Sequence, residues 1–474
     1  MAAIISDKIK RLFLTQLFDE ATGTKLGDSD NYYYIGVGRS QTWDPTGVSD
    51  AAISPLNDER EEREFRYGAQ AVKAIEAFSF VVPTKDWTAN SQYAQYNDNV
   101  VGQPATSYYI RTADNNVYVC IRAGKDTLGN VQVSTVKPDH TDITLPIETD
   151  GYVWKYLYTI STADTNFFVT SNYMPIKFVD SAAATDPYFG QYTIQNAAIA
   201  GQIIGYRVVD GGQNYDAADT LTVIGDGSGA TARVIVSSGV ITAVEVGDSD
   251  NVGVIGSTPQ GKTITEAMGS GYTQANVRIT TSTGDDNAEI VPIFAHRNGL
   301  GADPREDLRA SAMMFHIKPE GTVDDTWVTG NQDYRQVALW RNPLDSAGEL
   351  FTGTSGTALR KIAVTAVIPD GFAFEDNIRM TGDSNANAWI DYIEDSTIWY
   401  HQDEYTGFTP FRVSENINIG AEPETSPALA RTIDLHDISP GIDRFTGDVF
   451  FVSNDAAQPR TDQSTDDIKL VIQL

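Results

Sequence analysis

Residues 152–160 read YVWKYLYTI, an alternation of side chains that is typical of a β-strand. One face of this strand carries aromatic rings: Tyr152, Trp154, Tyr156 and Tyr158. The opposite face carries Val153, Lys155 and Leu157. Because both faces bear large residues, the pattern predicts a central strand or a strand at an interface.

Strand patterns of the same kind recur on both sides of this stretch. They precede it at 32–37 (YYYIGV), 78–83 (FSFVVP), 107–112 (SYYIRT) and 116–123 (NVYVCIRA). They follow it at 336–340 (QVALW), 361–368 (KIAVTAVI), 396–402 (STIWYHQ), 447–452 (GDVFFV) and 468–474 (IKLVIQL). The sequence therefore predicts a mainly β protein with a multi-domain, β-sandwich-like core.

A few short helices are expected between these strands. The first is amphipathic and is capped by Ser6 or Asp7; its apolar stripe consists of Ile9, Leu12, Phe13 and Leu17. Its charges lie within the apolar region rather than before it, so we interpret it as a helix and not as a signal peptide. A second helix is expected over about Asp58–Gln70, and a third where Pro304 follows the capping residue Asp303.

A degenerate repeat begins at Gly201, where Gly, Ala, Val, Ile and Thr dominate in short runs. Each copy pairs a strand with a turn that ends in tyrosine, first at Asn214-Tyr215 and then at Gly271-Tyr272. A repeated β-hairpin that buries a shared face explains this pattern. The glycine-rich run GDGSGA at 225–230 lies within the repeat and lacks the Lys-Ser/Thr pair of a phosphate loop, so a tight turn is expected there.

Charge and length bound the possible functions. The 474 residues include 64 acidic and 34 basic ones, giving a formal net charge of -30. So acidic a surface repels phosphate backbones, and no nucleic-acid partner is expected. No stretch reaches the ~18 apolar residues of a membrane span, and no membrane partner is expected. Cys120 is the only cysteine and lies in a strand pattern, which favours a packed core thiol and a reducing compartment.

No catalytic signature is present in the sequence. The five histidines (His140, His296, His316, His401 and His436) lack paired metal-ligand spacing, and no GxSxG motif occurs. The motif GDSDN, at 27–31 and 247–251, could hold calcium, but both copies lack the other ligands of a calcium loop and favour turns. We therefore expect no catalytic, metal-binding or cofactor-binding residues.

Several segments resemble the gene product eight family, the baseplate wedge subunits of T4-like contractile-tailed phages. They occur in the family's order: 34–43 (YIGVGRSQTW), 81–87 (VVPTKDW), 117–121 (VYVCI), 150–158 (DGYVWKYLY), 335–343 (RQVALWRNP) and the C-terminal 447–474. This resemblance covers about a third of the chain. The extra length relative to the family falls in the repeat region and in about 346–440.

The resemblance implies a structural protein without catalytic activity, located in the tail baseplate of the virion and assembled in the host cytoplasm. It implies a homodimer that contacts other wedge proteins. It also implies five parts: wedge core over 1–186, an inserted β-repeat module over 187–295, core again over 296–345, a second inserted β region over 346–440, and C-terminal core strands over 441–474. The expected core or interface residues are Trp43, Trp87, Trp154, Tyr156 and Tyr158.

Two other readings of the sequence remain open. β-Repeats rich in Asp, Asn and aromatic residues also occur in carbohydrate-binding tail or adhesin modules, which need an exposed aromatic platform. A glycan-degrading tail enzyme would need two facing carboxylates in a cleft, a separation that is spatial and not visible in sequence.

Overall fold

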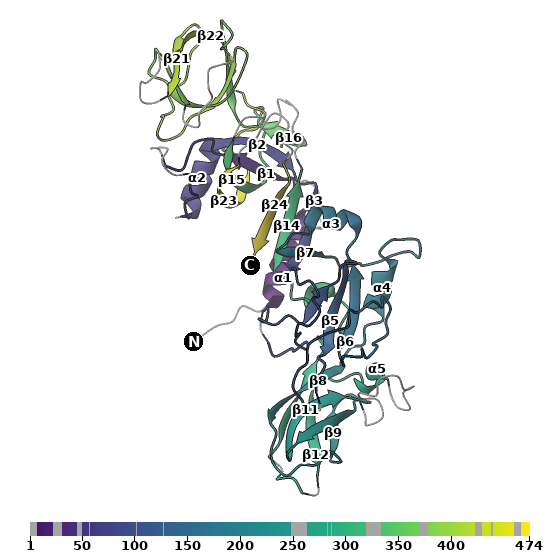
Figure 1. The fold of residues 1–474 in the computed structure, drawn as a ribbon. Helices are drawn as coiled ribbons and strands as arrows, with labels where there is room; N and C mark the ends of the chain where they lie inside the picture. The colour runs from purple at the N-terminus through teal and green to yellow at the C-terminus, as the bar shows by residue number, and fades with distance from the viewer. Residues whose placement is uncertain are drawn as a thin grey trace. The chain divides into compact units, whose positions relative to one another are not determined.

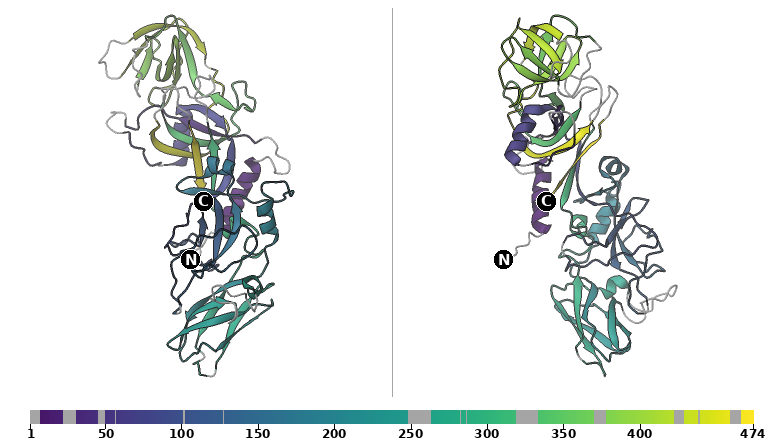
Figure 2. Two further views of the ribbon diagram at one scale, coloured as in Figure 1. Left: turned by 45° about the vertical axis from the view of Figure 1, so that its right-hand side comes forward. Right: turned by 60° about the vertical axis from the view of Figure 1, so that its left-hand side comes forward.

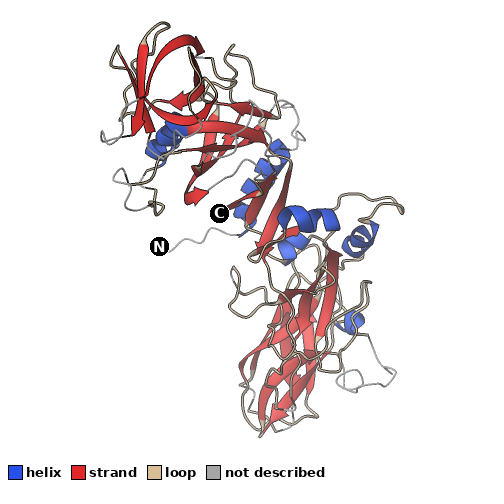
Figure 3. Ribbon diagram, turned by 45° about the horizontal axis from the view of Figure 1, so that its top comes forward, coloured by secondary structure: helices blue, strands red, loops and turns tan. Residues whose placement is uncertain are grey.

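The computed structural model describes residues 7–474 except 22–30, 45–49, 248–262, 319–332, 370–377, 422–428, 459–465 and the single positions 56, 101, 127, 282, 286 and 438. The chain forms two compact units. Unit 1 comprises Met1–Leu14, Ser79–Met314 and Val471–Leu474, and unit 2 comprises Thr15–Phe78 and Phe315–Leu470. Strands dominate both units, as Figure 3 shows, and the expected mainly β class is confirmed.

Unit 1 contains a three-stranded antiparallel sheet built around the aromatic strand. Its order is β4 (Tyr109–Arg111), β5 (Asn116–Arg122) and β6 (Val153–Thr159). β6 is thus an edge strand of this sheet and not a central one, and the alternative of a strand at an interface stays a prediction. Both faces of β6 are nevertheless largely buried, and helices α3 (Thr162–Phe168) and α4 (Phe189–Asn196) follow it. Cys120 pairs with Trp154 in the β5–β6 register and is fully buried, which confirms the expected core thiol.

The repeat region of unit 1 forms two further antiparallel sheets (Figure 1). One pairs β8 (Ile203–Asp210) with β13 (Glu289–Phe294). The other has the order β11 (Val240–Val246), β10 (Ala232–Ser237), β9 (Thr220–Gly225) and β12 (Ala275–Thr280). The tyrosines of the two turns, Tyr215 and Tyr272, are both buried. The GDGSGA run connects β9 to β10; Gly229 has φ +88°, but Ser228 forms a bridge with Ser270, so the run is a longer connection and not the tight turn that was expected.

A four-stranded sheet has the order β24 (Ile468–Gln473), β14 (Ala312–Ile317), β3 (Ala77–Pro83) and β7 (Tyr173–Ile176). The chain passes from one unit to the other within β3, β14, β24 and helix α1 (Asp7–Ala21). The C-terminal strand β24 therefore pairs with β14, and β3 and β7 from the first half of the sequence complete the same sheet. The two short helices of unit 1 are α5 (Ile264–Ala267) and α6 (Pro304–Asp307); Asp303 caps α6 by accepting from Arg305 N, as expected.

Unit 2 contains a five-stranded sheet of order β16 (Ser355–Thr357), β2 (Ala69–Ala74), β1 (Tyr33–Gly38), β15 (Tyr334–Arg341) and β23 (Asp448–Gln458). Helix α2 (Asp58–Gly68) is capped by Asn57, whose side chain accepts a hydrogen bond from Arg60 N. Its buried Phe65 packs edge-on against Trp340, with 5.8 Å between the ring centroids. A Cβ at Gly36 would lie 2.9 Å from the Phe65 ring. Glycine at this point of β1 therefore lets the helix approach the sheet.

The second expected insertion contains a closed barrel (Figure 2). Its order is β17 (Arg360–Val364), β20 (Thr397–His401), β19 (Asn387–Glu394), β18 (Ile378–Gly382), β21 (Asn416–Ala421) and β22 (Leu429–Asp437). Pairing of β17 with β22 closes the ring. Its interior is filled by buried side chains, among them Ile362, Ile390, Tyr400 and Ile417, so it is a packed core and not a pore. The five-part division of the chain stays a prediction.

Candidate functional site

A surface turn in unit 2 presents aromatic rings to solvent. The turn at 403–408 follows β20 and carries Tyr405 and Phe408. Tyr405 stacks on Trp389 of β19 at 5.6 Å between ring centroids, and Phe408 contacts Tyr67 at 5.2 Å. Tyr67 also contacts Phe445 edge-on at 6.0 Å. We call these five residues the aromatic patch.

The aromatic patch is exposed although its backbone is well ordered by hydrogen bonds. Tyr405 is 66% exposed, Phe408 53% and Phe445 56%. Asp403 holds the turn: its Oδ1 accepts from the backbone N–H groups of Tyr405 and Thr406 at 3.0 and 2.8 Å, and its Oδ2 accepts from Trp389 Nε1 at 2.7 Å. Rigid exposed aromatic rings lose little entropy on binding and form the centres of many protein interfaces.

The rim of the aromatic patch is charged. Arg63 Nε of α2 lies 3.2 Å from Glu404 Oε1, and both side chains are more than half exposed. An apolar centre with a polar rim is the usual anatomy of a protein-binding surface. The aromatic patch has this arrangement, with apolar rings at its centre and the Arg63–Glu404 pair at its edge.

A second exposed apolar surface lies on helix α1. The expected apolar stripe is present, yet Ile9 is 45% exposed, Leu12 65% and Phe13 60%, whereas Leu14 is buried. Ile9, Leu12 and Phe13 thus face solvent instead of packing on the core, whereas Leu17, the fourth residue of the stripe, is partly buried. Apolar helix faces of this kind bind grooves on partner proteins.

A buried Ser–Asp–His cluster in unit 2 has the residue types of a hydrolase triad but not its geometry. Ser40 Oγ donates to Asp391 Oδ1 at 2.8 Å, and Asp391 Oδ2 lies 2.6 Å from His401 Nδ1. His401 Nε2 contacts Gln41 instead of the serine. A triad needs the histidine to accept the serine proton, so this cluster cannot activate Ser40. It joins the barrel to the segment that follows β1.

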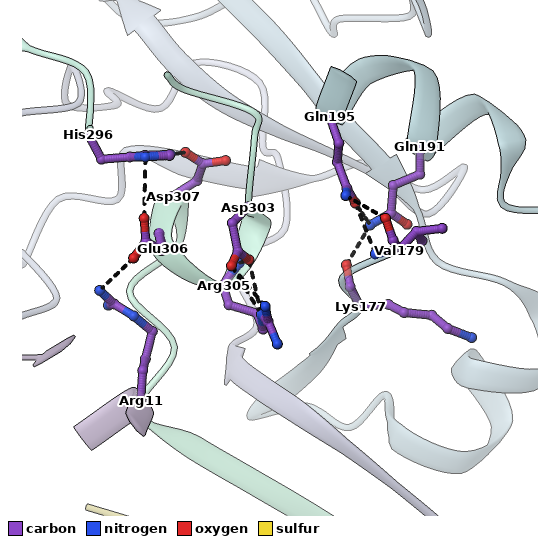
Figure 4. A network of polar contacts seen from close by, with 10 residues as sticks. All are labelled: Arg11, Lys177, Val179, Gln191, Gln195, His296, Asp303, Arg305, Glu306 and Asp307. Carbon is purple, nitrogen blue, oxygen red and sulfur yellow. Dashed lines mark hydrogen bonds and ion pairs between the residues drawn. The ribbon is translucent and has the colours of Figure 1, made fainter. Parts of the chain in front are cut away.

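The buried polar network of unit 1 centres on His296 and Asp307 (Figure 4). His296 Nε2 lies 2.7 Å from Asp307 Oδ1, and His296 Nδ1 lies 3.3 Å from Glu306 Oε2. Glu306 also lies 3.6 Å from Arg11 of α1, and Asp307 Oδ2 accepts from Gly301 N at 2.9 Å. Alternating charges thus link α6, α1 and the loop after β13.

Two further contacts shown in Figure 4 have a similar structural role. Asp303 caps α6 and also binds the Arg305 guanidinium at 2.9 Å. Gln195 of α4 donates to Val179 O at 2.9 Å and accepts from Val179 N at 3.2 Å. These bonds fix helix ends and the segment that leads to α4.

The network should make the stability of unit 1 depend on pH. Burial lowers the pKa of His296, but the hydrogen bond and charge of Asp307, with Glu306 and Asp303, outweigh burial and raise that pKa above 6.5. A raised histidine pKa gives stability that is complete below pH 6.5 and is lost as pH rises through the folded value. Burial also raises the pKa of Asp307 above its ordinary value.

We therefore expect the free energy of unfolding of wild-type protein to fall between pH 6 and pH 9 more than that of His296→Gln. Urea denaturation at several pH values measures this difference. Asn99→Gln, in an exposed loop, is the matched control. The pH dependence of its free energy of unfolding should equal that of wild type. An equal pH slope in wild type and His296→Gln would show that the His296 pKa is not raised by folding.

The structure places the residues expected in the core or an interface as follows. Trp154, Tyr156 and Tyr158 are buried, and Trp154 lies between Tyr93 and Tyr152 at 5.4 and 5.6 Å. Trp43 is buried under Arg39, whose guanidinium carbon lies 4.3 Å from the ring centre. Trp87 is only partly buried and packs at the edge of the Trp154 cluster. Trp87, Trp154 and Tyr156 therefore meet in one hydrophobic cluster of unit 1, whereas Trp43 belongs to unit 2.

Sequence reasoning missed the aromatic patch. Its signal was the run YTGFTPF at 405–411, where aromatic residues alternate with turn-forming residues. Both GDSDN motifs fall mainly outside the described residues, so the calcium alternative is not addressed there. Within the described ranges, no three His, Cys, Asp or Glu side chains gather as a metal site would require.

None of the helices in the described part of the chain has the length and hydropathy that a membrane crossing requires. Comparison with known proteins yields no matching family model and no curated protein with significant sequence similarity.

Proposed function

We propose that the chain is a structural subunit of a phage tail baseplate wedge, which assembles through protein–protein contacts and does not catalyse a reaction. The observation that carries this proposal is the aromatic patch, a rigid apolar surface with a charged rim. The exposed stripe of α1 adds a second surface in the other unit. A subunit within a larger assembly needs several separate contact surfaces, whereas an enzyme needs a convergent cleft.

The segments that resemble baseplate wedge subunits indicate which assembly we propose. These segments include 34–43, 150–158 and 335–343, which resemble baseplate wedge subunits. The proposal includes a homodimer, contacts with other wedge proteins and a location in the virion tail. The buried Ser40 and His296 clusters support a non-catalytic role, because their polar atoms bind one another instead of facing a ligand.

The test is a triple substitution of the aromatic patch, Tyr405→Ser, Phe408→Ser and Phe445→Ser. Because these side chains are exposed, the melting temperature should stay close to wild type, while one or more contacts should weaken by about 2 kcal/mol or more, the usual size for interface hot spots. Co-expression with the tail proteins encoded beside its gene, followed by size-exclusion and sedimentation, measures complex and dimer formation.

The matched control is Val413→Ser, which removes another exposed apolar residue of the barrel region, 56% exposed and outside the patch. It should assemble like wild type. Full assembly of the triple variant would reject the aromatic patch as a contact surface. If the triple variant and Val413→Ser both fail to assemble, the cause is the removal of exposed apolar side chains in general and not of the aromatic patch.

A second function, glycan binding, is favoured by one observation. Tyr405 lies nearly parallel to Trp389, with 20° between the ring planes, and presents an exposed flat face. Sugar rings stack on such faces. A glycan array probed with wild type and Tyr405→Ser distinguishes the two functions: the structural proposal predicts no saturable glycan signal, and a signal lost in the variant would favour the binding module.

A further inference from the structure

Unit 1 contains a cavity that the proposed function does not use. Its volume is about 400 Å³, within the range of pockets that bind small molecules. The lining residues come from the three-stranded sheet, the loop after α4, β8, α5 and the segment before α6. They include Ile121, Lys155, Ile199, Ile204, Met268 and Leu300.

Lys155 is the charged residue in this largely apolar lining. It lies on β6 opposite Val119 of β5, on the face away from the aromatic cluster. Among the described residues, no carboxylate or hydrogen-bond acceptor lies within bonding distance of its ammonium group. Burial lowers the pKa of Lys155, and the more distant carboxylate of Asp307 opposes this shift only in part.

Two other buried cations among the described residues, Arg309 and Arg444, bind backbone carbonyls, whereas Lys155 does not. Arg309 donates to Gly102 O at 2.7 Å and to Asn97 O at 2.6 Å. Arg444 donates to Tyr67 O at 2.5 Å and also to Ala358 O. Because an unpaired cation in apolar surroundings is costly, the position of Lys155 is explained if a ligand supplies the missing anion.

We propose that this cavity binds a small monoanionic amphiphile, a carboxylate with a short hydrocarbon tail. The carboxylate pairs with Lys155, and the tail lies against Ile121, Ile204 and Met268. The hydroxyl and amide groups of Thr144 and Gln202 also line the cavity and can bond the second carboxylate oxygen. A phosphate ester fits less well, because it brings about two negative charges to one cation among apolar walls.

Octanoate is the probe, and 1-octanol is its uncharged counterpart. Isothermal titration of the full chain should show saturable, one-to-one binding of octanoate. Lys155→Met keeps the length of the side chain and removes its charge, so octanoate should bind at least tenfold more weakly while octanol binding is retained. Lys137→Met, which removes a lysine paired with Asp114 at the surface, should bind octanoate like wild type.

A second variant keeps the test decisive if Lys155→Met does not fold. Met268→Trp adds volume to the cavity wall and should abolish binding of both probes while leaving the rest of the chain unchanged. Absence of octanoate binding to wild type at millimolar concentration would overturn the proposal. So would equal octanoate affinity in wild type and Lys155→Met, or unchanged binding in Met268→Trp.

Discussion

Trp154→Ala should lower the free energy of unfolding of unit 1 by about 3–5 kcal/mol, the range for removal of a buried aromatic side chain. Trp154 is fully buried, stacks on Tyr152 with 9° between the ring planes, and meets Tyr93 edge-on. Its removal opens a cavity beside Cys120 and Tyr118, which belong to the same cluster.

The control is Trp154→Phe. The Trp154 Nε1 atom is buried and has no hydrogen-bond partner among the described residues, so phenylalanine removes no hydrogen bond. It should therefore cost much less than alanine. Urea unfolding, with hydrogen exchange of β5 and β6 to assign the transition to unit 1, measures both variants. Equal stability of the alanine variant and wild type would contradict the packing of this cluster.

Asp307→Ala should have an effect of similar size, about 3–5 kcal/mol, because removing one partner of a buried ion pair leaves the other uncompensated. The Asp307 side chain is fully buried; it binds His296 and accepts from Gly301 N. Loss of the Asp307 carboxylate leaves the backbone N–H of Gly301 without its acceptor. His296 then keeps its contact with Glu306 but not the one with Asp307. Unfolding should be measured at pH 6, where His296 is protonated.

Asp307→Asn separates the charge from the hydrogen bonds. The amide keeps one acceptor oxygen, so it should cost less than alanine, and it should also reduce the pH dependence between pH 6 and pH 9. An alanine variant as stable as wild type at pH 6 would show that the network of Figure 4 does not stabilise unit 1.

The sequence predicted individual strands well, because alternation is a local property. The aromatic strand was expected over 152–160 and is observed as Val153–Thr159. Barrel closure was not predicted, because β17 pairs with β22, about seventy residues later, and no local pattern records that pairing. The edge position of β6 was not predicted either. Large residues on both faces of a strand indicate burial, but helices and loops bury the two faces of β6 as well as strands do.

The candidate surfaces were harder to predict than the strands. The stripe of Ile9, Leu12 and Phe13 was visible in the sequence, but its periodicity cannot tell whether the chain itself or a partner covers it. Tyr405 and Phe408 lie in a turn, where exposure depends on neighbours from α2 and the segment before β23. Lys155 was read as one residue of a strand face, and its apolar surroundings became visible only with the fold.

The central claim is that this chain is a structural component of a baseplate wedge. The most direct measurement is quantitative mass spectrometry of baseplates detached from purified virions of the phage that encodes it, combined with a density map of the same particles. We expect twelve copies in each baseplate, two in each of six wedges, with the aromatic patch against a neighbouring protein. Absence of the chain from the baseplate, or a patch that faces solvent in every copy, would contradict it.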